Sequence, residues 1–265
     1  MPDTPRWYVL KGRFDEAENV LKRLQPEIDS KKEVEEIKSL VYKENKKEKF
    51  KFEKWMLLPL IICVGCMFIQ QWSGINTIIY YAPTILKQAG FSDNLGAIYA
   101  TTGIGIVNFL MTFVAIYLTD RVGRKPLLYV GLTGVGLCLI LLALSFSNIE
   151  FLGEYSKYFA LISTILYIMF FAFSLGPIMF VISTEVSPLR IRGVMMSIAM
   201  MSNFAFNFMV SLSFLPMLKA FGEFNTFMLF AVISFISIIF VRFVIPETKG
   251  KSLEEIERNW IKGNV

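Results

Sequence analysis

The sequence predicts an all-α polytopic membrane protein built as a bundle of six transmembrane helices. Hydrophobic residues make up 54% of the 265 residues. A helix of about 20 apolar residues spans a bilayer. The sequence holds six apolar runs of at least that length, in residues 55–86, 96–119, 126–147, 158–183, 194–218 and 224–245. Residues 1–54 differ, because they are polar and charged and contain no long apolar run.

Residues 1–54 are predicted to form short cytoplasmic amphipathic helices. Thr4 and Pro5 are typical of the N-cap and the first position of a helix. Apolar residues then recur at helical spacing in residues 15–24 and 31–42. The expected organisation is therefore cytoplasmic linker helices in residues 1–54, a six-span bundle in residues 55–245 and a cytoplasmic tail in residues 246–265.

The distribution of positive charge predicts the orientation in the membrane. Lys and Arg accumulate in cytoplasmic loops. With the N-terminus inside, the inner loops hold Arg121, Arg124, Lys125, Arg190 and Arg192, and the outer loops hold only Lys87, Lys157 and Lys219. We therefore expect a multi-pass protein of the plasma membrane with both termini in the cytoplasm.

The composition disfavours several classes of function. The chain has no histidine, and Cys63, Cys66 and Cys138 lie in apolar runs that disfavour a reactive thiolate. We therefore expect no metal site and no cofactor. No catalytic nucleophile or phosphate-binding loop is found, so enzyme activity is not expected. The net charge of +5 follows from the loops that set the topology, so the expected partner is the lipid bilayer and not nucleic acid.

One polar stretch interrupts the first apolar run. Residues 70–81 read Gln-Gln-Trp-Ser-Gly-Ile-Asn-Thr-Ile-Ile-Tyr-Tyr. A polar group buried in hydrocarbon costs roughly 2–7 kcal/mol unless it is paired. We interpret the stretch as one face of a wet cavity that binds a molecule rich in hydroxyl groups, because an amide offers both donors and acceptors. The alternative is that these amides only link packed helices.

This stretch resembles the seventh span of the sugar-porter family of the major facilitator superfamily. The pattern Q-Q-x-S-G-x-N-x-x-x-Y-Y carries the resemblance. In that family the span supplies the main amides that bind sugar. The resemblance therefore implies that Gln70, Gln71, Asn76 and Tyr80 contact a monosaccharide.

The same resemblance extends the predicted sugar site to later spans. Asn108 lies twelve residues before Asp120, the spacing of a sugar-contacting Asn in the family. The other implied contacts are Asn203, Phe171, Phe180 and Phe204. Phe180 and Phe204 stand where the family often has Trp. A Phe keeps an apolar face for a sugar ring but loses the indole N–H donor, which puts the usual glucose-type specificity in question.

Gly74, Gly176 and Pro177 are predicted hinges. A Gly-Pro pair inside a span removes backbone hydrogen bonds and kinks the helix. The family's tenth span has this pattern, and it implies bending as the cavity opens and closes. A static kink is the alternative.

Charged residues at span ends are predicted to form a cytoplasmic latch. The loop D-R-V-G-R-K at residues 120–125 resembles a loop shared by the whole superfamily, and E-V-S-P-L-R-I-R-G at residues 185–193 and P-E-T-K-G at residues 246–250 resemble sugar-porter motifs. The implied members are Asp120, Arg121, Arg124, Glu185, Arg192 and Glu247. The alternative is that these charges only set the topology and face solvent.

The start of the chain resembles the segment after the sixth span of a twelve-span transporter. The residues that carry this resemblance are P-D-T-P-R-W, followed by G-R-F-D-E-A. The chain is therefore expected to be the C-terminal half of the major facilitator fold. It would transport sugar by alternating access with a missing N-terminal six-span half, supplied by a separate chain or by self-association. Two alternatives are a truncated or split gene product without transport of its own and a non-transporting sugar sensor. The resemblance specifies neither the sugar nor the choice between uniport and proton symport.

Overall fold

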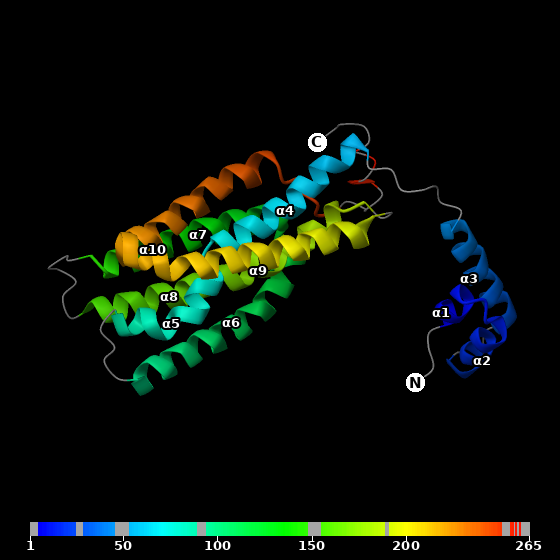
Figure 1. Cartoon of the computed structure of the whole chain (residues 1–265), viewed down its shortest axis with the longest axis horizontal. Coiled ribbons are helices and arrows are strands. Elements are labelled where there is room, and N and C mark those ends of the chain that lie inside the picture. Colours follow the sequence, from blue (N-terminus) through cyan, green and yellow to red (C-terminus); the bar gives the residue numbers. More distant parts are fainter. Residues whose placement is uncertain are drawn as a thin grey trace. The chain divides into compact units, whose positions relative to one another are not determined.

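A computed structural model describes residues 5–24, 29–45, 53–88, 94–147, 155–188, 191–250 and residues 255, 256, 258 and 260 (Figure 1). The regular elements in these ranges are all helices, which confirms the predicted all-α class. The chain divides into two compact units, Met1–Glu53 and Lys54–Val265.

The first unit is a small helical cluster. It contains α1 (Pro5–Leu10), α2 (Phe14–Leu24) and α3 (Ser30–Asn45). Of the apolar residues predicted to form a stripe in residues 15–24, Ala17, Val20 and Leu21 are buried, and α2 packs against the other two helices. The buried side chains are those of Tyr8, Val9, Ala17, Val20, Leu21 and Val34.

The second unit is the membrane bundle. After a short 3-10 turn (Lys54–Met56) it contains α4 (Leu57–Trp72), α5 (Ile75–Gln88), α6 (Asn94–Val122), α7 (Arg124–Ser145), α8 (Ser156–Phe173), α9 (Leu175–Val186) and α10 (Arg192–Phe243). Within the described residues, five helical segments are long and apolar enough to cross a membrane. These segments confirm a polytopic membrane bundle.

The longest helix, α10, accounts for two of the six predicted spans. Its 52 residues would extend about 78 Å as one straight helix, more than twice the hydrocarbon thickness. Gly222 has non-helical dihedrals (φ 76°, ψ 169°), a left-handed conformation that glycine adopts without strain. In Figure 1 the yellow and orange parts of α10 meet at the left of the view and both extend from there to the right, so the chain reverses its direction between them. The predicted loop between residues 218 and 224 is thus a turn centred on one residue.

Two predicted continuous spans are broken in the structure. The span predicted for residues 55–86 is interrupted at Ser73 and Gly74, between α4 and α5. Gly74 has a φ of 89°, so the chain cannot continue as an α-helix through it. The polar stretch of residues 70–81 is therefore divided between the end of α4 and the start of α5.

The second break separates α8 from α9 at Ser174, two residues before the predicted Gly176-Pro177 hinge. Pro177 therefore lies in the first turn of α9, where a backbone N–H has no partner within the helix. The proline is accommodated there without the loss of a helical hydrogen bond.

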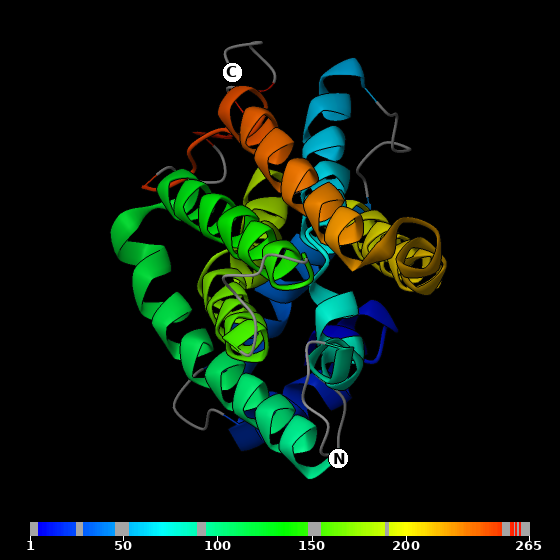
Figure 2. The same cartoon turned by 90° about the vertical axis from the view of Figure 1, so that its left-hand side faces the viewer.

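Close helix packing surrounds the second break. Gly131 and Gly134 of α7 face Ser174 and Phe170, which lie against the glycine backbones. Small residues allow such close approach between membrane helices. By contrast, α6 lies along the outside of α8 in both views (Figures 1 and 2), and most of its large side chains are exposed. The close packing at Gly131 and Gly134 therefore holds α8 on α7.

We expect Gly131→Ala to destabilise the bundle by about 1–3 kcal/mol, the usual effect of overpacking. A methyl group at Gly131 would overlap the side chain of Ser174. Gly105→Ala on α6 is the matched control, because a methyl group there meets no atom within 4 Å. Melting temperatures of both variants in one detergent test this, and equal values would contradict it.

Candidate functional site

The break between α4 and α5 is held by local side-chain hydrogen bonds. Ser73 Oγ donates to the carbonyl of Gln70 (2.7 Å), and Thr77 Oγ1 donates to the carbonyl of Gly74 (2.6 Å). The last carbonyls of a helix lack helical partners, and the Ser73 hydroxyl supplies one for Gln70. The Gly74 carbonyl, at the start of α5, accepts from the backbone N–H of Ile78 (3.0 Å) as well as from Thr77. As a result Gln70 and Gln71 lie in the last turn of α4, and Asn76 lies in the first turn of α5.

Four of the predicted amides form one continuous hydrogen-bonded chain. Asn76 Nδ2 donates to Gln71 Oε1 (2.6 Å), and Gln71 Nε2 donates to Asn203 Oδ1 of α10 (3.0 Å). Asn203 Nδ2 then donates to Gln70 Oε1 (2.6 Å). The structure thus brings together amides that lie up to 133 positions apart in the sequence.

The chain of amides ends on the backbone of α9. Gln70 Nε2 donates to the carbonyls of Leu175 (3.3 Å) and Gly176 (2.9 Å). The side chain of Gln70 therefore joins the first helix break to the second. We call Gln70, Gln71, Asn76 and Asn203 the amide cluster.

The members of the amide cluster differ in the hydrogen bonds that they have left to give. An amide has two N–H donors and a carbonyl oxygen with two lone pairs. Gln70 and Asn203 each use both N–H donors, counting a bond from Asn203 Nδ2 to the sulfur of Met67 at 3.3 Å. Among the described residues, Asn76 uses one N–H only, and Gln71 uses one N–H and one lone pair.

The exposed fraction of the side chain distinguishes Asn76 from the other three members of the amide cluster. Gln70, Gln71 and Asn203 are buried, whereas Asn76 is partly exposed. Asn76 is therefore the most accessible member and has the most free capacity. The four side chains carry no charge, so the arrangement is suited to binding hydroxyl groups and not to proton transfer.

The other predicted sugar contacts lie in varied surroundings. Phe171 is buried and stacks on Tyr167 (ring centroids 6.5 Å apart), and Phe180 is partly buried. Tyr80 and Phe204 are 57% and 64% exposed. Asn108 is partly exposed, and among the described residues no hydrogen bond joins it to the amide cluster. The structure therefore assembles the four amides but leaves Asn108, Tyr80 and Phe204 apart from their hydrogen bonds.

A separate groove of about 560 Å³ lies between α4 and α10. Its lining is almost entirely apolar and includes Ile61, Phe68 and Phe240, with none of the four amides. Its chemistry does not match a ligand rich in hydroxyl groups, so the amide cluster is the better candidate.

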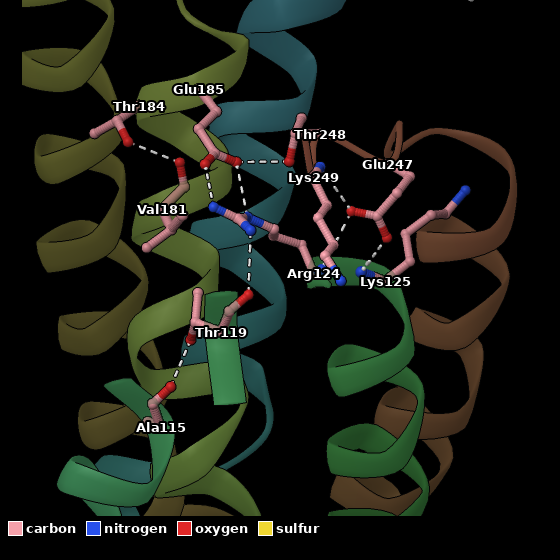
Figure 3. Close-up of polar contacts among 10 residues, drawn as sticks. All are labelled: Ala115, Thr119, Arg124, Lys125, Val181, Thr184, Glu185, Glu247, Thr248 and Lys249. Carbon is pink, nitrogen blue, oxygen red and sulfur yellow. Dashed lines mark hydrogen bonds and ion pairs between the residues drawn. The ribbon is translucent and has the colours of Figure 1, made fainter. Parts of the chain in front are cut away.

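Some of the predicted latch residues contact one another where α7 begins and α9 ends (Figure 3). Arg124 at the start of α7 forms two hydrogen bonds with Glu185 of α9, from Nη2 (2.7 Å) and from Nε (3.2 Å). Arg124 Nη1 also donates to the carbonyl of Thr119 (3.1 Å), and Thr248 Oγ1 donates to Glu185 (2.6 Å). Paired charge-assisted bonds of this kind are stronger than neutral ones.

Glu247 completes this group by accepting backbone N–H groups. Its carboxylate accepts from Arg124 (3.2 Å), Lys125 (3.0 Å) and Lys249 (3.0 Å). Burial by itself would raise the pKa of the Glu247 carboxyl, but the backbone donors outweigh it and hold the pKa below its ordinary value. We call Arg124, Glu185, Glu247 and Thr248 the charged cluster.

Two other predicted latch residues, Arg121 and Arg192, lie apart from these contacts. The guanidinium of Arg121 lies 4.2 Å from the ring of Tyr117, and only its backbone carbonyl is tied in, by Lys249 Nζ (2.5 Å). Arg192 donates to the carbonyl of Ser187 (3.4 Å), and its Nε has no hydrogen-bond partner among the described residues. Among the described residues, the Glu185 carboxylate therefore pairs with Arg124 and not with Arg121. The side chain of Asp120 lies outside the described residues.

Three contributing residues were not singled out from the sequence. Thr248 stands within the quoted P-E-T-K-G motif, but its contact with Glu185 depends on the fold. Met67 has no sequence signal that marks its sulfur as an acceptor. Tyr167 offered a signal, since a hydroxyl within an apolar run needs a partner, and it donates to the carbonyl of Ser73.

Comparison with known proteins finds one matching family model, described as "Sugar (and other) transporter", over residues 1–260. The galactose-proton symporter of Escherichia coli (strain K12) is 36% identical over 269 residues, covering 99% of this chain and 57% of the symporter. The putative metabolite transport protein YwtG of Bacillus subtilis is 38% identical over 98% of this chain and 56% of that protein.

A solved structure is also similar. The inward-open xylose transporter XylE from E. coli matches with a TM-score of 0.73 and 29% identity, covering 98% of this chain and 52% of XylE. The chain thus spans about half the length of the curated relatives that it matches.

We expect Arg124 and Glu185 to be energetically coupled. Their side chains are only 12% and 19% exposed, so each single change, Arg124→Met or Glu185→Gln, leaves a poorly solvated partner. A double-mutant cycle on thermal stability should show a coupling of about 1–3 kcal/mol. The pair Arg13–Glu16, whose side chains are 49% and 46% exposed, is the control and should show at most about 0.5 kcal/mol. Equal couplings for the two pairs would contradict this interpretation.

We expect the stabilisation by Glu247 to disappear in acid. Its folded pKa lies below its ordinary value of 4.5, so the contribution is complete above that ordinary value and is lost as pH falls through the folded pKa. The difference in melting temperature between the wild type and Glu247→Gln should be constant from about pH 5 to pH 7 and shrink below that range. A difference that persists undiminished in strong acid would show that the carboxylate charge is not responsible.

Proposed function

The chain belongs to the sugar (and other) transporter family, and on that premise we propose that it binds a monosaccharide at the amide cluster and carries it across the membrane by alternating access. It is an integral multi-pass membrane protein of that family. The proposed direct contacts are the spare donors and acceptors of Asn76 and Gln71. The apolar faces of Phe171, Phe180 and Phe204 would lie against the sugar ring.

The hydrogen-bonding state of the amide cluster carries this proposal. Within the part of the chain that the structure describes, Asn76 leaves one N–H and its whole carbonyl oxygen unused, and it is the partly exposed member. Gln71 holds Asn76 in place and keeps one N–H and one lone pair for a ligand. Each net hydrogen bond contributes about 1 kcal/mol, so a few such bonds give the weak, reversible binding that a carrier needs.

The names of the relatives support the class of substrate. They include a galactose-proton symporter and a myo-inositol transporter, and a similar structure is a xylose transporter. All three compounds present several hydroxyl groups on one ring. This shared chemistry suits amides that offer both donors and acceptors.

Alternating access requires a second bundle, and we propose that an N-terminal six-span half supplies it, as a separate chain or through self-association. The cavity of such transporters lies between two bundles that rock against each other. Large exposed side chains on α10, including Phe204 and Phe208, and on α6, including Phe109, provide apolar faces that a partner bundle or lipid can cover.

We further propose that the charged cluster stiffens the cytoplasmic end of this bundle. Its contacts join the start of α7, the end of α9 and the segment after α10 within one unit. A latch to another bundle would engage the groups that this cluster leaves available, notably the exposed side chain of Arg121. The positive charge at this end supports its placement in the cytoplasm of a plasma-membrane protein.

We expect Asn76→Ala to lower sugar affinity by about tenfold or more, because two or more hydrogen bonds of about 1 kcal/mol are lost. Binding of radiolabelled D-galactose, D-xylose and myo-inositol would be measured in lipid nanodiscs, with the chain alone and co-expressed with an N-terminal six-span half of a relative. Asn225→Ala is the matched control, since the exposed Asn225 donates to the nearby Phe221 carbonyl (2.8 Å) and has no bond to the amide cluster among the described residues.

Two results would count against the proposal in different ways. Retained affinity in Asn76→Ala would show that the sugar binds elsewhere. Absence of binding for every probe, with and without the second half, would contradict transport of these sugars by this chain.

A further inference from the structure

The two broken helices of the bundle are tied to each other in both directions. From the first break, Gln70 Nε2 donates to the carbonyls of Leu175 (3.3 Å) and Gly176 (2.9 Å) at the start of α9. From the helix that precedes the second break, Tyr167 Oη donates to the carbonyl of Ser73 (3.0 Å). Each break therefore accepts a side-chain hydrogen bond from the helix pair that contains the other.

The carbonyl of Ser73 depends on this hydroxyl. Gly74 turns the chain out of the α4 helix immediately afterwards, and among the described residues no backbone N–H donates to the Ser73 oxygen. Ser73 is 1% exposed and Tyr167 is 0% exposed, so water does not replace the hydroxyl readily. A buried carbonyl without a partner is strongly unfavourable, and the Tyr167 bond therefore stabilises this conformation of the break.

Tyr167 belongs to the more closely packed of the two segments that its hydrogen bond joins. It belongs to α8, which packs closely on the glycine backbones of α7 through Phe170 and, just beyond its end, Ser174. The ring of Tyr167 also stacks on Phe171 (interplanar angle 16°). The acceptor of the Tyr167 hydrogen bond lies in the junction between α4 and α5. This junction comes between Gln71 and Asn76 in the sequence, the two amides with free hydrogen-bonding capacity.

We propose that Tyr167 is a positioning residue for the amide cluster. Its hydroxyl holds the α4–α5 break in the conformation that places Gln71 and Asn76 side by side, and together with Gln70 it makes the two breaks change conformation as one unit. Tyr167 does not contact the ligand itself, because it is fully buried behind the break. The link to sugar affinity rests on the proposed function, whereas the tie between the breaks does not.

The test is Tyr167→Phe, which removes the hydroxyl and keeps the ring that stacks on Phe171. Tyr158→Phe on the same helix is the matched control, because the Tyr158 ring is 51% exposed. Hydrogen–deuterium exchange of the wild type and both variants would be followed in nanodiscs by mass spectrometry. Faster exchange is expected in peptides covering residues 74–78 of Tyr167→Phe, with unchanged exchange around residues 124–125.

The second measurement is affinity for D-galactose, D-xylose and myo-inositol. For any of these that binds the wild type, we expect Tyr167→Phe to weaken binding about five- to tenfold, as for the loss of one buried hydrogen bond, with unchanged stoichiometry. Tyr158→Phe should match the wild type in both measurements.

The outcomes separate the two proposals. Wild-type exchange in residues 74–78 of Tyr167→Phe overturns the positioning role, and so does a uniform rise in exchange throughout the bundle, which marks a general loss of stability. Faster exchange in residues 74–78 with unchanged affinity for a sugar that binds the wild type would show that the hydroxyl stabilises the break only. That result overturns its role in binding. Local acceleration without binding of any probe supports the tie and counts against the proposed function alone.

Discussion

The bundle depends on one constraint: a polar group buried among apolar helices must find its partner inside the protein. Two helix breaks, at Ser73 and at Ser174, leave backbone groups without helical partners among these apolar helices. The carbonyls near these breaks accept hydrogen bonds from Gln70, Tyr167 and nearby hydroxyls. The breaks and the amide cluster are therefore parts of one arrangement, because the side chains that satisfy the backbone also set the geometry of the predicted binding groups.

The two interpretations of the buried amides are compatible in this structure. Gln70 and Asn203 use their N–H donors within the bundle and act as links between helices. Asn76 and Gln71 are held by those links and keep groups free for a ligand. A site of this kind is preorganised, so a sugar would not have to break the network before binding.

The charged cluster solves a similar problem at the end of the bundle with ionised groups. Arg124 and Glu185 are mostly buried, and each has a further hydrogen bond beyond the pair. Arg124 donates to the carbonyl of Thr119, and Glu185 accepts from Thr248. Such additional bonds offset the cost of desolvating a charge pair. The cluster fixes three helix ends relative to one another, which suits a bundle that moves as a rigid body.

The sequence by itself determined the all-α class, the apolar spans, the family and the types of residue at the candidate site, because hydrophobic runs and long motifs are local signals. It did not show that the helix breaks at Ser174 or that Arg124 and not Arg121 meets Glu185. Nor did it show that Gln70 uses both of its N–H donors while Asn76 uses one. These were decided by tertiary structure. Chemically equivalent groups compete for partners far away in the chain, and only the distances between packed helices select among them.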